Sequence, residues 1–255
     1  MKFADTHAHL HFPHFEEDRD QLIKLFPSKG VEFVINVGID VEDSKKAVEL
    51  AKKYERIYCS VGVHPHEAGK VKPDYLEKLE ELTKEKKVVA IGETGLDYYR
   101  NFSSKEDQTK VFKEQLLLAK ELDLPVIIHI RDAYEDAYKI LSEIGLPTKG
   151  GVVHAFSADS DWALKFVQLG LFIGIGGPVT YPKNLSLKSV VRAVGIENIL
   201  TETDCPYLPP QQLRGKRNEP SYIRLVLEEI AKILDEDVEQ VAQITLANAK
   251  ELFLS

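Results

Sequence analysis

Six histidine and acidic side chains have the types and positions that a metal-binding site requires. His7 and His9 stand two residues apart, so in an extended segment both imidazoles point to the same side of the chain. Such a pair can hold one metal ion, although an isolated pair of this kind is also found as ordinary surface or capping histidines. The other four candidates each follow or end a short apolar run; they are Glu93, His129, His154 and Asp204.

Short apolar runs recur along the chain and are the elements that must position these side chains. Several are rich in valine and isoleucine without polar alternation, which is typical of strands buried on both faces. We expect eight strands, near residues 3–6, 31–37, 57–63, 88–91, 126–130, 152–154, 172–175 and 199–202.

Amphipathic stretches lie between the runs and predict helices. The clearest covers residues 104–122, where Phe112, Leu116 and Ala119 form one apolar stripe. We expect further helices at residues 17–26, 41–53, 74–85, 134–144, 160–169, 187–193, 221–234 and 238–252. Eight strand and helix units with an extra C-terminal helix predict one domain over residues 1–255, an α/β fold of the (β/α)₈ TIM-barrel type. A doubly wound open sheet is the alternative, disfavoured because no GxGxxG motif opens a helix.

The six candidates all fall at the carboxyl ends of the expected strands. In a closed parallel barrel these ends meet on one face, where active sites of this architecture are built. A buried histidine or a helix cap explains any one of them alone, but six such coincidences at equivalent positions are improbable. Mixed histidine and carboxylate ligands suit Zn, Mn, Fe or Ni, with Mg an alternative. Six ligands exceed the needs of one tetrahedral ion, so we expect two ions with Glu93 as their bridge.

Composition limits the classes of function and the compartment. The formal net charge of -8 argues against a general nucleic-acid coat protein, since such proteins neutralise phosphates with lysine and arginine. It is compatible with an enzyme that holds one scissile phosphate through metal ions.

No apolar run is long enough to span a membrane, and Cys59 and Cys205 form no CxxC motif. We therefore expect a cytoplasmic protein without membrane contact.

With these residues in place, the sequence resembles the TatD-type deoxyribonuclease family of the metal-dependent, amidohydrolase-like superfamily. The resemblance runs nearly end to end and is specific because several motifs contribute. They are DTHAHL at 5–10, VGVHPH at 61–66, GETGLDY at 92–98, LPVIIHIRDA at 124–133, HAFS at 154–157, ETDCPY at 202–207, RGKRNEP at 214–220, and Asn248.

The resemblance implies a TIM-type barrel, divalent metal cofactors and hydrolysis of DNA, in several members as a 3′ to 5′ exonuclease on single strands. It implies that His7, His9 and Asp204 bind one ion, that His129 and His154 bind the other, and that Glu93 joins both. Two positions depart from the family pattern. His11 stands where many members have an acid, and Ala158 stands where a glycine is common. Neither is a ligand position in the family, so they affect the substrate loops rather than the metals.

Further residues near the strand ends are candidates for catalysis and substrate binding. Asp204 beside a metal is well placed to act as general base. His64 and His66 are assigned to phosphate contact or to a third, weaker ion together with Glu202; ordinary loop histidines are the alternative. The remaining basic candidates for phosphate contact are Arg131 and the cluster Arg214, Lys216 and Arg217, for which a solvated loop is the alternative. Aromatic candidates for base stacking are Tyr98, Tyr99, Phe156 and Tyr207.

Three functions compete on this basis. The first is a metal-dependent deoxyribonuclease that hydrolyses DNA through a two-metal-activated water. The second is a metal-dependent ester or amide hydrolase, such as a D-aminoacyl-tRNA deacylase. The third is a non-enzymatic binding module, which is the weakest because the chain lacks a broad basic face. Glu93 in place of the carbamylated lysine of many amide hydrolases, and the basic cluster at 214–217, favour the nuclease.

Overall fold

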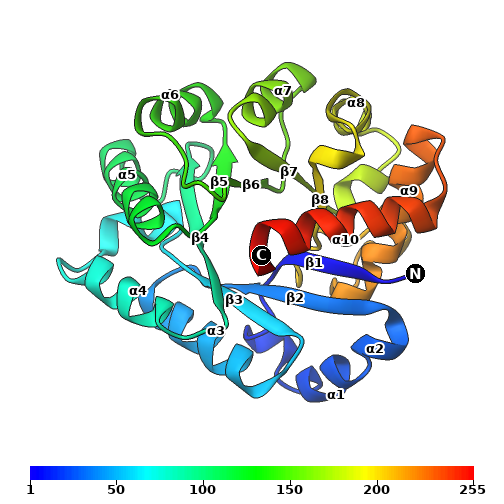
Figure 1. The fold of residues 1–255 in the computed structure, drawn as a ribbon, viewed down its shortest axis with the longest axis horizontal. Helices are drawn as coiled ribbons and strands as arrows, with labels where there is room; N and C mark the ends of the chain where they lie inside the picture. Colours follow the sequence, from blue (N-terminus) through cyan, green and yellow to red (C-terminus); the bar gives the residue numbers. More distant parts are fainter.

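The computed structural model describes residues 1–255 and contains eight parallel strands that pair in chain order (Figure 1). Buried apolar side chains dominate these strands, as expected when helices cover the outer face of a barrel. The strands are β1 Phe3–Ala8, β2 Val31–Val37, β3 Ile57–Val61, β4 Val88–Asp97, β5 Val126–Arg131, β6 Gly151–His154, β7 Leu171–Ile175 and β8 Ile199–Thr201.

The barrel closes where β1 and β8 lie side by side. The Thr6 hydroxyl donates to the carbonyl oxygen of Thr201 at 3.1 Å, and the Thr201 hydroxyl donates to the carbonyl oxygen of Ala4 at 3.2 Å. A single parallel bridge joins Ala8 to Cys205 just beyond β8. The predicted (β/α)₈ barrel is therefore confirmed, nearly closed by these bonds between β1 and β8, and the alternative of a doubly wound open sheet is excluded.

Ten α-helices surround the strands and follow the predicted order. They are α1 Arg19–Lys24, α2 Phe26–Lys29, α3 Val41–Lys53, α4 Tyr75–Thr83, α5 Lys105–Leu122, α6 Tyr134–Ile144, α7 Ser160–Gln168, α8 Leu185–Val194, α9 Ile223–Leu234 and α10 Val238–Leu254. The 3₁₀ helices are η1 Pro13–Phe15, η2 Pro65–Lys70, η3 Gly177–Thr180, η4 Ile196–Asn198, η5 Gln211–Leu213 and η6 Pro220–Tyr222. The prediction of one helix at 17–26 was wrong in its extent, because the chain forms two short helices there, with Pro27 in the first turn of α2.

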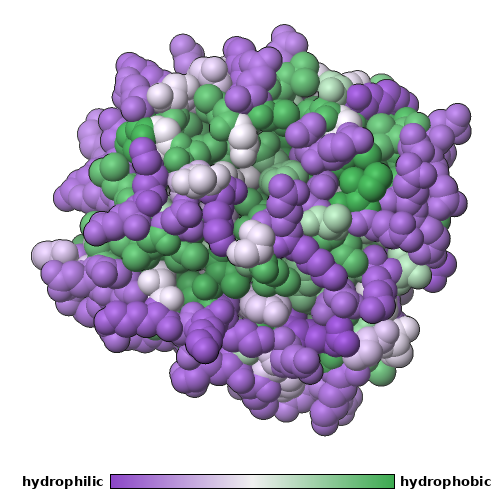
Figure 2. Space-filling model, viewed as in Figure 1, coloured by the Kyte–Doolittle hydropathy of each residue, from purple (hydrophilic) through white to green (hydrophobic).

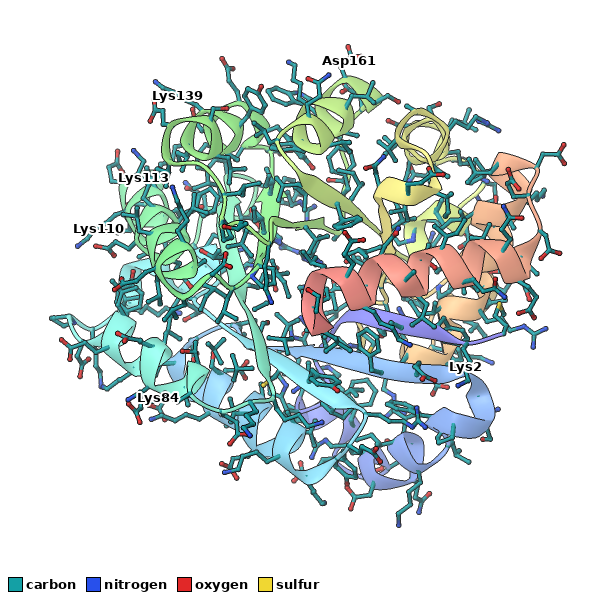
Figure 3. All side chains as sticks on the ribbon, viewed as in Figure 1. Lys2, Lys84, Lys110, Lys113, Lys139 and Asp161 are labelled. Atoms are coloured by element: carbon teal, nitrogen blue, oxygen red, sulfur yellow. The ribbon has the colours of Figure 1, made fainter.

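The N-terminal mouth of the barrel is closed by α10, which crosses it in Figure 1. Leu252 and Phe253 of this helix join a buried cluster with Phe33, Ile35 and other strand residues. The larger apolar core lies between the sheet and the outer helices. On the face seen in Figure 2, hydrophilic side chains cover the periphery, and the charged residues labelled in Figure 3 point outward. The polar candidate residues therefore lie at the opposite, carboxyl end of the barrel.

Strand β4 contains a bulge at the position that matters most for the site. Between Ile91 and Thr94 the strand advances three residues, while the partner positions on β5, Val126 and Ile128, are only two apart. Gly92 has a φ of 145°, and a Cβ atom there would lie 2.6 Å from the carbonyl oxygen of Ile127. Glycine is therefore required next to Glu93, and the bulge sets the direction of the Glu93 side chain.

No helix combines the length and apolar character needed to cross a membrane.

Candidate metal centre and catalytic site

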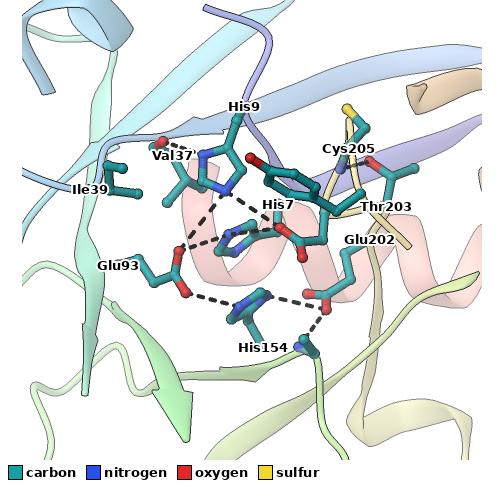
Figure 4. A network of polar contacts seen from close by, with 12 residues as sticks. His7, His9, Val37, Ile39, Glu93, His154, Glu202, Thr203 and Cys205 are labelled. Atoms are coloured by element: carbon teal, nitrogen blue, oxygen red, sulfur yellow. Dashed lines mark hydrogen bonds and ion pairs between the residues drawn. The ribbon is translucent and has the colours of Figure 1, made fainter. Parts of the chain in front are cut away.

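All six predicted ligands meet at the carboxyl end of the barrel. Figure 4 shows four of them, His7, His9, Glu93 and His154, turned toward one another. The six come from β1, β4, β5 and β6 and from the segments directly after β1 and β8. Four of them, His7, His9, Glu93 and His154, are buried, and the side chains of His129 and Asp204 are 17% and 18% exposed. Residues more than 190 positions apart in sequence, such as His7 and Asp204, therefore lie within one small volume.

Glu93 lies at the centre of the group and faces different histidines with its two oxygens. Oε1 lies 3.0 Å from Nδ1 of His129 and 3.0 Å from Nε2 of His154. Oε2 lies 3.2 Å from Nε2 of His7 and 4.0 Å from Nε2 of His9. One carboxylate thus connects two sets of nitrogen atoms, which is the arrangement that a bridge between two ions requires.

The end of β8 places Asp204 beside the pair on β1. Its Oδ1 lies 3.4 Å from Nε2 of His9 and 3.9 Å from Nε2 of His7. The backbone N–H of Asp204 donates to the carbonyl oxygen of His7 at 2.8 Å. The buried carboxylate of Asp5 accepts hydrogen bonds from the backbone N–H groups of His7 and Thr203, at 3.2 and 3.0 Å. These bonds hold the tips of β1 and β8 in one register.

The donor atoms fit divalent cations. Each of three groups brings its ligand atoms within 4.8 Å of one another: His7, His9 and Asp204; His64, Glu93 and His129; and His7, His154 and Glu202. Both ring nitrogens of the buried His7 lack a hydrogen-bond partner. A buried polar atom without a partner is costly, and a cation between His7 and the carboxylates would remove that cost. His64 and Glu202 fall in different groups, so the structure does not bring them together around one position.

The far side of each histidine ring determines which nitrogen can bind a cation. Nδ1 of His9 donates to the carbonyl oxygen of Val37 at 2.8 Å, and Nε2 of His129 donates to Oδ2 of Asp97 at 3.1 Å. Nδ1 of His154 lies 3.5 Å from Oε1 of Glu202, a charge contact without hydrogen-bond alignment. Histidine ligands commonly donate their second ring N–H to an oxygen acceptor, as His9 and His129 do here, and the other ring nitrogen is then free for the metal.

Asp97 is a site residue that the sequence reasoning missed. It is buried at the end of β4, and its Oδ2 also accepts a hydrogen bond from Nε2 of His66 at 2.8 Å. Its only sequence signal is its place in the motif at 92–98. His11, which departs from the family pattern, instead contacts Asp43 and Asn36, at 2.9 and 3.0 Å, and so ties the segment after β1 to α3.

The electrostatics of the cluster keep its acids ionised. Burial alone would raise the pKa of Glu93, but the charges of His154, His64 and His7 hold that pKa well below its ordinary value. Burial would likewise raise the pKa of Asp204, and its contact with His9 lowers it. Burial lowers the pKa of His64 to about 4. Both carboxylates therefore carry negative charge at neutral pH, as metal ligands or a general base must.

A cavity of about 710 Å³ opens above the cluster. Three of the predicted substrate residues, His64, His66 and Arg131, line it. The guanidinium of Arg131 lies 4.0 Å from the ring centroid of Tyr99, and it has no acidic partner among the ion pairs of the chain.

Other residues also line the cavity. Arg100, Phe12 and Phe102 were not singled out from the sequence, and of the aromatic candidates Phe156 and Tyr207 also contribute. The hydroxyl of Tyr98 instead donates to Asp136.

The basic cluster at 214–217 does not line this cavity. The guanidinium of Arg217 donates to both carboxylate oxygens of Asp18, at 2.7 and 2.6 Å, and packs over the ring of Phe15. Arg214 lies over the ring of Tyr181, with 4.9 Å to its centroid. Lys216 is exposed. Arg217 thus fastens the segment after β8 to the segment before α1.

Comparisons with known proteins show the family to which the chain belongs. A sequence model of the family described as TatD related DNase matches residues 4–254. An uncharacterised metal-dependent hydrolase of Bacillus subtilis, YabD, is 41% identical over 249 residues, which cover 98% of each chain. A protein of Salmonella typhimurium named 3′-5′ ssDNA/RNA exonuclease TatD is 35% identical over 254 residues, again covering 98% of each. The crystal structure of the TatD homologue YjjV from Escherichia coli superposes with a TM-score of 0.94 at 34% identity, covering 99% of this chain and 98% of that one.

Proposed function

The chain belongs to the TatD related DNase family, and from this premise we propose that it is a metal-dependent nuclease that hydrolyses phosphodiester bonds of single-stranded DNA or RNA from the 3′ end. The observation that carries the proposal is Glu93, whose two carboxylate oxygens face two separate sets of histidine nitrogens at the floor of the cavity. A relative named as a single-strand exonuclease, similar over nearly its whole length, supports the choice of substrate.

The proposal assigns two divalent ions to this centre. His7, His9 and Asp204 would hold one, His129 and His154 would hold the other, and Glu93 would contact both. When bound, such ions lower the pKa of water and stabilise the charge that builds up on a phosphate. The nitrogen and oxygen donors suit Zn, Mn, Ni or Fe, and Mg where water completes the coordination.

The chain's own residues supply the proton acceptor and the grip on substrate. Asp204 is ionised, lines the cavity and is partly exposed, so its carboxylate can take the proton of the water that attacks phosphorus. The bond from phosphorus to the sugar oxygen of the shortened strand then breaks, and that oxygen takes a proton from solvent. Arg131 and Arg100 provide positive charge at the cavity for neighbouring phosphates, and Phe102 and Tyr207 provide exposed rings on which unpaired bases can stack.

The site lies in a protein with two free buried cysteines, Cys59 and Cys205, which fits a reducing compartment. The proposal therefore places the reaction in the cytosol.

The test is a substrate panel with the purified protein loaded with Mn, Mg, Zn or Ni in turn. The substrates are single-stranded DNA labelled at the 5′ end, the same strand blocked at its 3′ end, duplex DNA, RNA, D-aminoacyl-tRNA and a simple ester. We expect progressive shortening of unblocked single strands, loss of activity with a 3′ block, and no activity after chelation. Faster cleavage of the aminoacyl ester than of any phosphodiester would replace the nuclease assignment with the deacylase.

A further inference from the structure

His64 is placed like a ligand, but its ring is hydrogen-bonded in the opposite sense to those of His9 and His129. Its ring is buried and lines the cavity, with Nε2 3.4 Å from Oε1 of Glu93. Its Nδ1 accepts a hydrogen bond from the backbone N–H of His66 at 3.0 Å. In His9 and His129, by contrast, the nitrogen remote from the centre faces an oxygen acceptor and so carries the proton.

The bond from His66 fixes where the proton of His64 resides. A ring nitrogen that accepts a hydrogen bond uses its lone pair, and in a neutral imidazole the proton is then on the other nitrogen. His64 caps η2, with Pro65 in its first turn, and a side chain at this position commonly accepts from the N–H two residues on. The backbone itself therefore selects the form of His64 with Nε2–H directed at the centre.

A nitrogen that carries a proton offers no lone pair to a cation. The grouping of His64 with Glu93 and His129 thus satisfies distance but not chemistry as a metal site. The nearest acceptor of the Nε2–H within the chain is Oε1 of Glu93, at a long 3.4 Å, and that oxygen already faces His129 and His154 at 3.0 Å each. A donor held this weakly at the wall of the substrate cavity is available to a bound phosphate.

We propose that His64 is a catalytic hydrogen-bond donor, whose Nε2–H stabilises a charged phosphate oxygen on the side of the centre formed by His129 and His154, and that it holds no metal ion. The inference rests on the proposed nuclease function. The ring keeps its proton throughout, so no acid step is added to the reaction. Neutral imidazoles that polarise a substrate oxygen are known in other enzymes.

The variants His64→Ala and His64→Gln separate a donor from a ligand. Glutamine extends an amide N–H to about the reach of Nε2, whereas alanine supplies nothing. We expect both variants to bind as many ions per chain as wild type, measured by elemental analysis at limiting metal, with His129→Ala as the control that loses one. We expect kcat on a single-stranded oligodeoxynucleotide to fall by about 10² to 10³ in His64→Ala, as for other deleted donors, and by at most about tenfold in His64→Gln.

Nitrogen NMR of the histidine rings in the metal-loaded protein gives a readout that does not depend on activity. We expect His64 to show a protonated Nε2 and an unprotonated Nδ1, and His66→Ala to preserve this pattern because it keeps the backbone N–H. A protonated Nδ1, or the loss of an ion in His64→Ala, would show that His64 is a metal ligand and would overturn the proposal. An equal fall of kcat in both variants would also overturn it. If the wild-type protein cleaved no nucleic acid, the proposed nuclease function would be refuted, but the NMR experiment would still report which nitrogen of His64 carries the proton.

Discussion

Replacing Asp97 with asparagine tests whether an acid that binds no ion controls one of the two proposed metal positions. Its Oδ2 accepts from His129 and His66, and its Oδ1 accepts from the backbone N–H of Arg100 at 2.8 Å. All three partners are donors. The amide group of asparagine would therefore face a donor whichever way it turned, leaving a buried N–H unpaired and His129 less firmly oriented.

The magnitude follows from these contacts. Loss of a carboxylate that orients a histidine ligand costs about 10- to 100-fold in metal affinity, or about 1.4 to 2.7 kcal/mol. The buried, unpaired donor lowers the free energy of unfolding of the metal-free protein by about 1 to 3 kcal/mol. Only one ion is affected, because Asp97 contacts neither His7, His9 nor Asp204.

The assay is competition for metal against a chromophoric chelator, which resolves the stronger and weaker ion of each variant. Asp136→Asn is the matched control, since that acid bonds the Tyr98 hydroxyl and no ligand. We expect one dissociation constant of Asp97→Asn to rise by about 10- to 100-fold and the other to change less than threefold. Two unchanged constants, or equal weakening of both, would refute the orienting role of Asp97.

Three other substitutions test separate parts of the site. Glu93→Ala should weaken both ions, because each carboxylate oxygen faces its own set of nitrogens; two ions retained at wild-type affinity in elemental analysis would exclude the bridge. Asp204→Asn should keep the ion on the His129 side and lose about 10² to 10⁴ in kcat at neutral pH, with the loss shrinking as pH rises; wild-type turnover at saturating metal would exclude a general base. Arg217→Gln should lower the free energy of unfolding by about 0.2 to 1 kcal/mol at neutral pH. The hydrogen bond from Arg217 lowers the pKa of Asp18 in the folded protein, so the stabilisation by this ion pair is present above the unfolded pKa of about 3.9 and is lost as the pH falls through the folded pKa. Denaturant titrations of wild type and variant would contradict this if their free energies of unfolding differed by the same amount at pH 7 and at pH 2.

The strands and most helices were predictable because their signals are local. Apolar runs and helical stripes depend on neighbouring residues only, so α3 and α6 were predicted at their observed bounds. The convergence of the six candidate ligands was predictable for a related reason, since a parallel barrel brings the ends of its strands together whatever their sequence separation. Even Glu93, assigned to the end of a run at 88–91, lies within a longer β4 whose bulge keeps its side chain at the centre.

Partners that meet only in the folded chain were not predictable. Composition identified Arg217 as part of a basic cluster, but its partner Asp18 lies 199 positions away and neutralises the charge. Asp97 looked like any acid after a strand, because nothing in the local pattern shows that His129 and His66 converge on it. The candidate metal ligands could be proposed from residue type and position, whereas the groups that orient them depend on side-chain directions that the sequence does not display.

Two pairs of histidines have the same spacing in the sequence, and the backbone gives their rings different chemical roles. His7 and His9 stand two apart at the end of a strand, where the extended chain turns both rings to one side and Nδ1 of His9 finds the carbonyl oxygen of Val37. His64 and His66 have the same spacing, but Pro65 between them begins η2. The chain turns there, and the N–H of His66 points at the ring of His64 rather than along a strand. The same two residues at the same interval therefore present a lone pair to a cation in the first case and a proton to the cavity in the second.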